Sequence, residues 1–171
     1  LLSFIAELKK ENVIFAMEEP EIALPPHTQR RIVTYLLTKT TQCFVTSHSP
    51  YVIETFEPDR IMILRRNDTA TMTGHRVSLS ADVKAKTYRR YIRRGFAEAM
   101  LGRGVIVAEG ITEQLAIQAV AEKLEEGDST KYPLDLAGVT IITTDGDGSI
   151  PEFGRFFASL DLPTFAFLVK K

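Results

Sequence analysis

Short apolar runs alternate with helically spaced apolar residues through the first third of the chain. The runs at residues 13–17, 42–46 and 60–64 each predict a strand. Residues 27–39 carry apolar side chains at the spacing of one helical face and follow a pair of prolines, as is typical of a helix start. This order predicts parallel strands joined by helical crossovers, and the uninterrupted first run predicts a strand covered on both faces.

Polar residues rich in threonine and serine separate this part from the next. Residues 67–81 are weakly β-like and predict a surface hairpin or a linker. Residues 82–101 predict a helix whose first half is basic and whose end is apolar. The basic half has cations and no acid, namely Lys84, Lys86, Arg89, Arg90, Arg93 and Arg94. The net charge of −1 therefore hides a local basic surface.

A second set of alternating elements follows. Strands are predicted at residues 104–108, 139–143 and 164–169, with helices at 112–124 and 150–160 between them. The fold class that we expect for the whole chain is α/β, built from parallel-sheet βα units.

The composition is that of an ordinary globular protein. The chain has 171 residues, of which 44% are apolar and 25% charged, so a disordered or fibrous chain is excluded. No apolar run is long enough to cross a bilayer and no secretion signal is present, so we expect a cytoplasmic protein that does not bind membranes. The single cysteine, Cys43, fits a reducing compartment and is expected to be a buried strand residue rather than a reactive thiol. A helical pattern begins at the first residue, and we expect the chain to be a piece of a larger protein.

Carboxylates follow the first predicted strand directly. Glu18 and Glu19 stand where this strand ends, at the edge of a parallel sheet where ligands bind. One such carboxylate can hold Mg²⁺ and its waters, and the next can position the water that attacks a γ-phosphate. His48 follows the neighbouring strand and can contact the same phosphate. The alternative is a solvated acidic turn with an incidental histidine, which their joint position in consecutive βα units disfavours.

This region resembles the ABC-type ATPases. The resemblance lies in the strings EEPEIALPPHTQRRI and VTSHSP, which look like the Walker B strand and the switch-histidine loop of the overcoming lysogenization defect (OLD) nucleases and their DNA-repair relatives. It implies that Glu18 takes the place of the Walker B acid, where many relatives have aspartate, Glu19 that of the catalytic glutamate, and His48 that of the switch histidine. The glycine-rich phosphate loop and the ABC signature would lie upstream of Leu1. ATP binding therefore needs residues outside this chain, which alone should be inactive as an ATPase.

A carboxylate also ends the strand at residues 104–108. Glu109 is followed by Gly110, which permits a tight turn, and by a helix that Thr112 is expected to cap and whose first turn carries Glu113. Adjacent strand ends of a parallel sheet can supply several oxygens to a hard divalent cation. The alternative is an N-capped surface helix without chemistry.

This second segment resembles the first motif of Toprim domains, an apolar strand followed by EGxTE. Toprim domains occur in topoisomerases, primases and OLD nucleases, and in the OLD nucleases they directly follow an ABC ATPase, which is the order found here. The resemblance implies that Glu109 is a metal ligand or general acid–base and that Glu113 is a second acidic contributor. Asp145 and Asp147 follow the next strand among glycines, where they either bind the cation or form a common tight turn.

The third strand departs from the Toprim pattern. Toprim domains place an aspartate at its end, whereas Val169 stands near that position and two lysines follow. Either an acid lies beyond Lys171, or the site is altered, or the last residues are not native. A two-metal cleavage mechanism is therefore left open.

We expect part of an OLD-type ATP-dependent DNA endonuclease from the bacterial or archaeal cytoplasm, with a phage-defence role by family analogy. The domains expected are the C-terminal part of an ABC ATPase (residues 1–66), a linker with the basic helix (67–101) and the N-terminal part of a Toprim nuclease (102–171). The cofactors would be Mg²⁺ or Mn²⁺ and ATP, and the partners DNA and further copies of the chain, joined through the ATPase.

Other functions stay open. The basic helix either contacts DNA phosphates or is a solvated helix face. The whole chain either belongs to the nuclease or to a DNA-binding repair or chromosome-maintenance ATPase whose Toprim-like unit does not cut. A topoisomerase or primase relative is disfavoured because the first part is ATPase-like.

Overall fold

The computed structural model describes residues 14–67, 69–79, 93–128, 130, 133–144 and 146–168, with the backbone alone at 93, 94 and 147. The helix predicted at the start of the chain, most of the basic helix, Asp145 and Val169 lie outside the described residues. The chain divides into two compact units, Leu1–Glu57 and Pro58–Lys171.

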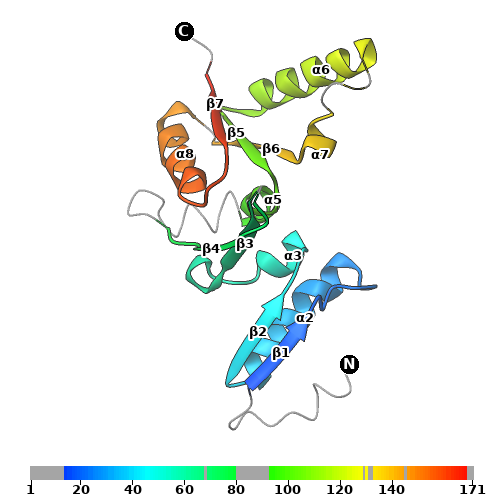
Figure 1. Ribbon diagram of the computed structural model, residues 1–171, viewed down its shortest axis with the longest axis vertical. Helices are drawn as coiled ribbons and strands as arrows, with labels where there is room; N and C mark the ends of the chain where they lie inside the picture. The colour runs from blue at the N-terminus through cyan, green and yellow to red at the C-terminus, as the bar shows by residue number, and fades with distance from the viewer. Residues whose placement is uncertain are drawn as a thin grey trace. The chain divides into compact units, whose positions relative to one another are not determined.

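The first unit has the predicted strand–helix–strand order. Strand β1 (Ile14–Glu18) is followed by helix α2 (Pro26–Lys39), strand β2 (Gln42–Thr46) and the short helix α3 (Pro50–Ile53), as Figure 1 shows. The two strands are parallel and pair in register to their ends, where Glu18 lies opposite Thr46. The loops that follow β1 and β2 therefore leave the sheet at the same edge.

One face of this two-stranded sheet packs on the helices. Ile32, Val33 and Leu36 of α2 are fully buried together with Val52 of α3, and the inward side chains of both strands pack against them. On the other face Ile14 and Phe44 are exposed. The prediction of a strand covered on both faces is therefore not met by the described residues, which supply only one layer of helices.

The third predicted strand does not continue the parallel sheet. After a 3₁₀ turn at Pro58–Arg60 (η1), strand β3 (Met62–Arg66) pairs with strand β4 (Met72–Arg76) in an antiparallel hairpin. The prediction of a third parallel strand was wrong because the partner follows after a short turn, and a parallel pair needs a much longer crossover. The segment at residues 67–81, predicted as a hairpin or a linker, contains only the second strand of the hairpin, and the first strand lies before it.

The hairpin belongs to the second compact unit, which begins at Pro58. Within this unit the Arg65 guanidinium donates hydrogen bonds to the carbonyl oxygens of Met100 (3.0 Å) and Gly102 (3.2 Å) at the end of helix α5 (Arg93–Leu101). Burial lowers the pKa of Arg65, and the nearby Asp161 carboxylate partly offsets this effect. The expected ATPase part of the chain ends at residue 66. The division into compact units does not test this boundary, because a compact unit can differ from a family domain, so the boundary stays a prediction.

A three-stranded parallel sheet forms the centre of the second unit. Its strands are β5 (Gly104–Ala108), β6 (Val139–Thr143) and β7 (Thr164–Phe167), and their order in the sheet is β6-β5-β7. All pairings are parallel, as the sequence predicts. The chain passes from β5 to β6 on one side and then crosses back to β7 on the other, so β5 lies at the point where the order reverses. In open α/β sheets such a point, at the carboxyl ends of the strands, is where ligands bind.

Helices flank this sheet on two sides. Helix α6 (Ile111–Gly127) connects β5 to the short helix α7 (Leu134–Ala137) before β6, while helix α8 (Ile150–Ala158) follows the 3₁₀ turn η3 (Asp147–Ser149). Figure 1 shows α6 and α8 on opposite sides of β5. The two crossovers leave the central strand in opposite directions. If both have the same hand, their helices cover opposite faces of the sheet.

Aromatic residues build the core beneath α8. Phe96 of α5 is fully buried against the rings of Phe153, Phe156 and Phe157, with ring centroids 4.7–5.3 Å apart. The opposite helix, α6, has no fully buried residue: its apolar side chains Leu115, Val120 and Leu124 are exposed, and Ile117 is half-buried. The packing of this unit is therefore concentrated on the α5–α8 side of the sheet.

Candidate functional site

The carboxyl edge of the β6-β5-β7 sheet brings three loop starts together. Ala108, the last residue of the central strand, pairs with Thr143 on one side and Phe167 on the other. Glu109, Thr144 and Leu168 are the next residues of the three strands, so the register places them along one edge. Glu109 occupies the central position and is half-buried.

Two carboxylates, Glu109 and Glu113, lie in the turn after β5 and in the first turn of α6. Gly110 is the N-cap residue of α6, and its extended backbone (φ −159°) leads directly into the helix. A Cβ placed on Gly110 would lie 3.3 Å from Oε2 of Glu113, so this carboxylate lies against the backbone of the residue that follows Glu109. The prediction that Thr112 caps the helix was wrong, because the helix begins at Ile111 and Thr112 lies in its first turn.

The turn after β6 is fastened to the end of β5. The Thr144 N–H donates to the Ala108 carbonyl oxygen at 3.1 Å, and the Gly146 N–H donates to the Glu109 carbonyl oxygen at 3.0 Å. The Thr144 hydroxyl also donates to the Gly146 carbonyl oxygen at 2.6 Å. Gly146 has φ 141°, a conformation that side chains rarely adopt, which explains the glycine in this turn.

These bonds hold Thr144 and Gly146 next to the end of β5. Asp145 itself lies outside the described residues, and of Asp147 only the backbone, in η3, is described.

The donors at this edge suit a hard divalent cation. Glu109 and Glu113 offer carboxylate oxygens, and Mg²⁺ is commonly held by one or two carboxylates while it keeps several waters. In the parts of the chain that the structure describes, no three His, Cys, Asp or Glu side chains gather into a metal-binding group. The end of β7 contributes Phe167 and Leu168, which are exposed and apolar. Among the described residues, Glu109 and Glu113 are therefore the carboxylates near this turn that such a cation could use.

The carboxyl edge of the first unit brings together the acids and the histidine that the sequence singles out. Glu19 follows β1 with a positive φ of 43°, and its N–H donates to the Thr46 carbonyl oxygen at 2.9 Å. Its carboxylate Oε1 lies 3.7 Å from Nε2 of His48, whose side chain is 86% exposed. Glu18, the last residue of β1, is exposed.

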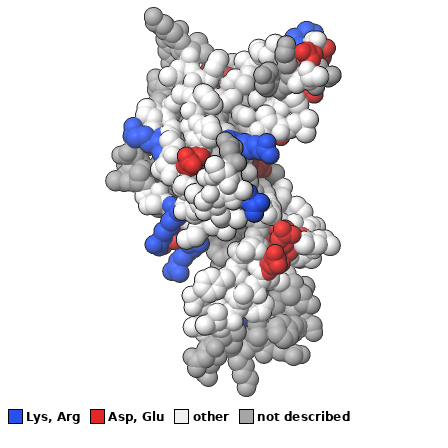
Figure 2. All heavy atoms as spheres, viewed as in Figure 1, with Lys and Arg blue, Asp and Glu red and all other residues white. Residues whose placement is uncertain are grey.

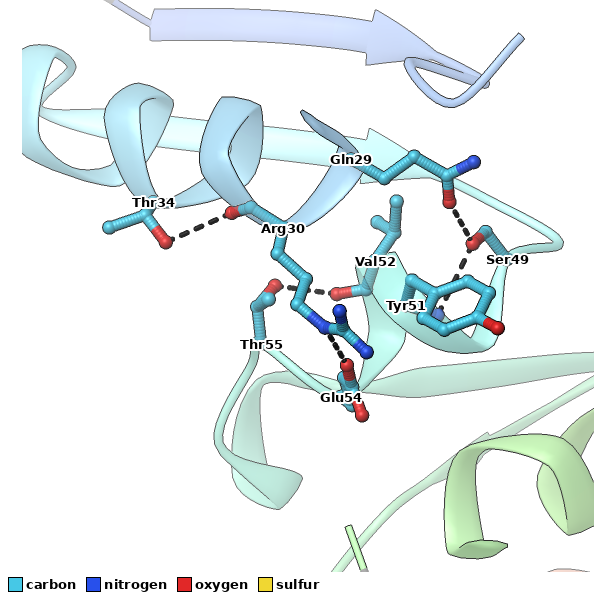
Figure 3. A network of polar contacts seen from close by, with 8 residues as sticks. All are labelled: Gln29, Arg30, Thr34, Ser49, Tyr51, Val52, Glu54 and Thr55. Carbon is cyan, nitrogen blue, oxygen red and sulfur yellow. Dashed lines mark hydrogen bonds and ion pairs between the residues drawn. The ribbon is translucent and has the colours of Figure 1, made fainter. Parts of the chain in front are cut away.

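Two polar residues that sequence reasoning did not select hold the loop after β2. Glu21 accepts hydrogen bonds from the Ser47 hydroxyl and the His48 N–H, and Gln29 accepts one from the Ser49 hydroxyl. Figure 3 shows the second of these anchors, in which Ser49 bridges to helix α2. The sequence offered one signal for Glu21. It is a third acid in EEPE, three residues after Glu18, and the proposed metal chemistry does not require it.

The predicted basic surface lies largely outside the described residues. Lys84, Lys86, Arg89 and Arg90 are not described, and Arg93 and Arg94 are described only as the first backbone residues of α5. On the face that Figure 2 shows, the described Lys and Arg side chains form separate groups rather than one continuous patch. A DNA-binding role for the basic helix therefore stays a prediction.

Cys43 lies in a strand, as the sequence predicts, but is only partly buried. It is a half-buried residue of β2 and packs against the α2 core. Burial raises the pKa of its thiol, an effect that a hydrogen bond with Thr40 partly offsets. A raised pKa disfavours the reactive thiolate.

A model of a known protein family matches part of the second unit. Residues 100–168 match the family model described as overcoming lysogenization defect protein-like, TOPRIM domain. No curated protein matches the chain. The matched segment contains the whole β6-β5-β7 sheet, and its parallel α/β architecture is that of a Rossmann-like Toprim fold. The match indicates metal-dependent cleavage of nucleic acid or a related activity.

None of the helices in the described part of the chain combines the length and apolar character that a membrane crossing requires.

Proposed function

We propose that this chain is part of an OLD-type ATP-dependent DNA endonuclease, in which the second unit cleaves phosphodiesters and the first belongs to an ABC-type ATPase core. One observation carries the nuclease half of the proposal. Glu109 follows the central strand of the parallel sheet at its topological reversal, inside the segment that matches the OLD-like TOPRIM model.

In this proposal Glu109 either holds Mg²⁺ or Mn²⁺ or takes a proton from the attacking water, and Glu113 assists from the first turn of α6. A divalent cation held there would supply positive charge to stabilise the phosphodiester transition state. The hydrogen bonds of Thr144 and Gly146 hold these two residues beside the end of β5 and the Glu109 carbonyl. Asp145 and Asp147 are proposed as further metal ligands from the same turn.

The ATPase half rests on the edge formed by β1 and β2. Glu18 is proposed to hold Mg²⁺ with ATP, Glu19 to position the water and His48 to contact the γ-phosphate. The 3.7 Å approach of Glu19 and His48 supports a shared site. Phosphate-binding residues from outside this chain, and a second copy of the ATPase, would complete it.

The direct test is nicking of supercoiled plasmid by the full-length protein with Mn²⁺. We expect Glu109→Gln to lower the rate by about 10²-fold or more, the usual effect of losing a general base. Glu122→Gln is the matched control, since Glu122 is an exposed acid on the same unit, about three turns along α6. Equal rates for wild type and Glu109→Gln would remove Glu109 from the active site.

A second candidate is a DNA-binding repair or chromosome-maintenance ATPase whose Toprim unit does not cut. One observation favours it, because β7 ends in the exposed apolar residues Phe167 and Leu168 where the family resemblance leads one to expect an acid nearby. This candidate predicts ATP hydrolysis and DNA binding by the full-length protein with no nicking in Mg²⁺ or Mn²⁺.

A further inference from the structure

One carboxylate, that of Glu21, accepts two hydrogen bonds from the loop that carries His48. Oε1 of Glu21 accepts a hydrogen bond from the Ser47 hydroxyl at 2.6 Å and a second from the His48 N–H at 2.8 Å. Both donors belong to the two residues that follow β2. A single oxygen atom therefore fixes the backbone at the point where His48 leaves the sheet.

The turn after β1 delivers this carboxylate. Glu19 and Ala23 both have positive φ, 43° and 61°, so the chain reverses tightly between them. The Ile22 N–H donates to the Glu19 carbonyl oxygen at 3.2 Å, and the Leu24 N–H donates to that of Glu21 at 3.0 Å. The reversal returns Glu21 to the end of β2, 26 residues away in sequence from Ser47.

A separate anchor holds the far side of the loop. The Ser49 hydroxyl donates to Gln29 of α2, and the Tyr51 N–H donates to the Ser49 hydroxyl at 3.2 Å as α3 begins. Figure 3 shows this anchor beside the ion pair of Arg30 with Glu54. The loop is thus tied to α2 after His48 and to the β1 turn before it.

The imidazole of His48 is the part of the loop that stays exposed. Its Nε2 lies 3.7 Å from Oε1 of Glu19, whereas the His48 N–H lies 2.8 Å from Oε1 of Glu21. The backbone contact is therefore the closer of the two. The position of the imidazole relative to Glu19 is thus set mainly by the backbone, which Glu21 holds. The other oxygen of Glu21, Oε2, is buried and has no hydrogen-bond partner among the described residues. Since only Oε1 is engaged, the contact needs an acceptor at that position rather than a negative charge.

We infer that Glu21 is a positioning residue for the proposed ATPase site: its Oε1 holds the Ser47–His48 backbone and thereby places the His48 imidazole beside Glu19. The inference rests on the proposed function. It separates two roles within EEPE, since Glu18 and Glu19 face the nucleotide in the proposal while Glu21 acts through His48.

The test measures kcat and KM for ATP hydrolysis by the full-length protein. Glu21→Ala should lower kcat at least 10-fold and change KM for ATP less than threefold, since the nucleotide contacts are untouched. Glu21→Gln, which keeps an acceptor oxygen, should stay within threefold of wild type. Gln42→Ala is the control, since Gln42 is exposed at the opposite end of β2. Ser47→Ala removes one of the two hydrogen bonds to Glu21, together with the bond from the Ser49 N–H to the Ser47 hydroxyl. It keeps the His48 N–H bond to Glu21 and should give an intermediate loss of kcat, so it serves as the test if Glu21→Ala does not fold.

Amide hydrogen exchange of the same proteins reports on the contact without ATP. Exchange of the His48 N–H should accelerate at least 10-fold in Glu21→Ala and remain near wild type in Glu21→Gln. Wild-type kcat in Glu21→Ala, unchanged exchange, or equal losses in the Ala and Gln variants would each overturn the inference. Absence of ATP hydrolysis by the wild-type protein would instead overturn the proposed ATPase function, so the two failures are distinguishable.

Discussion

The replacement of Phe96 by alanine tests the packing on which the candidate nuclease site depends. Phe96 is fully buried in α5 and contacts three phenylalanine rings, at centroid distances of 5.3 Å (Phe153), 4.8 Å (Phe156) and 4.7 Å (Phe157). Helix α5 leads directly into β5, the strand that ends before Glu109. Loss of this ring should therefore weaken the scaffold of the site without touching its chemistry.

The magnitude follows from the buried ring. A buried phenylalanine removes roughly 150–250 Å² from water, which at about 25 cal/mol per Å² corresponds to ~4–6 kcal/mol. Alanine retains part of this, and mutational series place such changes at about 3–5 kcal/mol. We expect Phe96→Ala to lower the free energy of unfolding of the second unit by about 4 kcal/mol. At an m value of about 2 kcal/mol per M, the urea midpoint should fall by roughly 2 M.

The assay is urea unfolding followed by hydrogen exchange and mass spectrometry, which resolves peptides of the two units separately. Phe165→Ala is the control, because Phe165 is 65% exposed and its loss should cost less than about 1 kcal/mol. Peptides from residues 14–57 should keep their midpoint in both variants. A loss below about 1 kcal/mol in Phe96→Ala, or an equal loss in the two variants, would refute the packing described here.

Three further substitutions or modifications probe other parts of the fold. Arg65→Ala should destabilise the hairpin against α5 by about 2 kcal/mol, seen as faster exchange in the hairpin peptides, because it removes two charge-assisted hydrogen bonds to the Met100 and Gly102 carbonyls; unchanged exchange would contradict the docking. Cys43 should react with a disulfide reagent at pH 8 more slowly in the folded chain than in urea, since its folded pKa is raised, and stability should fall as the pH rises through the range in which the unfolded thiol ionises; equal rates would show that the thiol is accessible. Gly102→Ala should cost about 1–3 kcal/mol in a urea melt because its Cβ would lie 2.8 Å from a backbone oxygen, whereas Gly127→Ala, with nothing within 4 Å, should be neutral or slightly stabilising; equal effects would contradict the close approach.

Much of the fold could be predicted because its signals are local. The apolar runs of β2, β5 and β6 end where the structure ends them, and Pro26 marks the start of α2. The parallel order follows from the alternation of strands and helices, and this order alone predicts that Glu19 and Glu109 lie at carboxyl edges. The contact of Glu19 with His48 was also predictable, since two adjacent parallel strands end together.

The failures arise where a nonlocal contact decides. Nothing within Met62–Arg66 distinguishes a parallel strand from one arm of a hairpin, and the pairing is decided by the short turn to Met72–Arg76. Apolar residues of α6 such as Leu115 and Leu124 are exposed, whereas the buried aromatic residues lie on the α8 side of the sheet, and the apolar content of the α6 segment does not reveal this difference. Glu21 was overlooked because its partners lie beyond a whole helix, and a tight reversal between Glu19 and Ala23 is needed to reach them.

The central claim is that the carboxyl edge around Glu109 gathers a divalent cation. The most direct measurement is an NMR titration of the protein with Mn²⁺, in which paramagnetic broadening reports proximity to the bound ion. If Glu109 holds the ion, the amides of Glu109, Gly110 and Gly146 should broaden first, and Glu109→Ala should abolish this effect while Glu122→Ala leaves it intact. Broadening that is centred elsewhere, or that is the same in Glu109→Ala, would contradict the account.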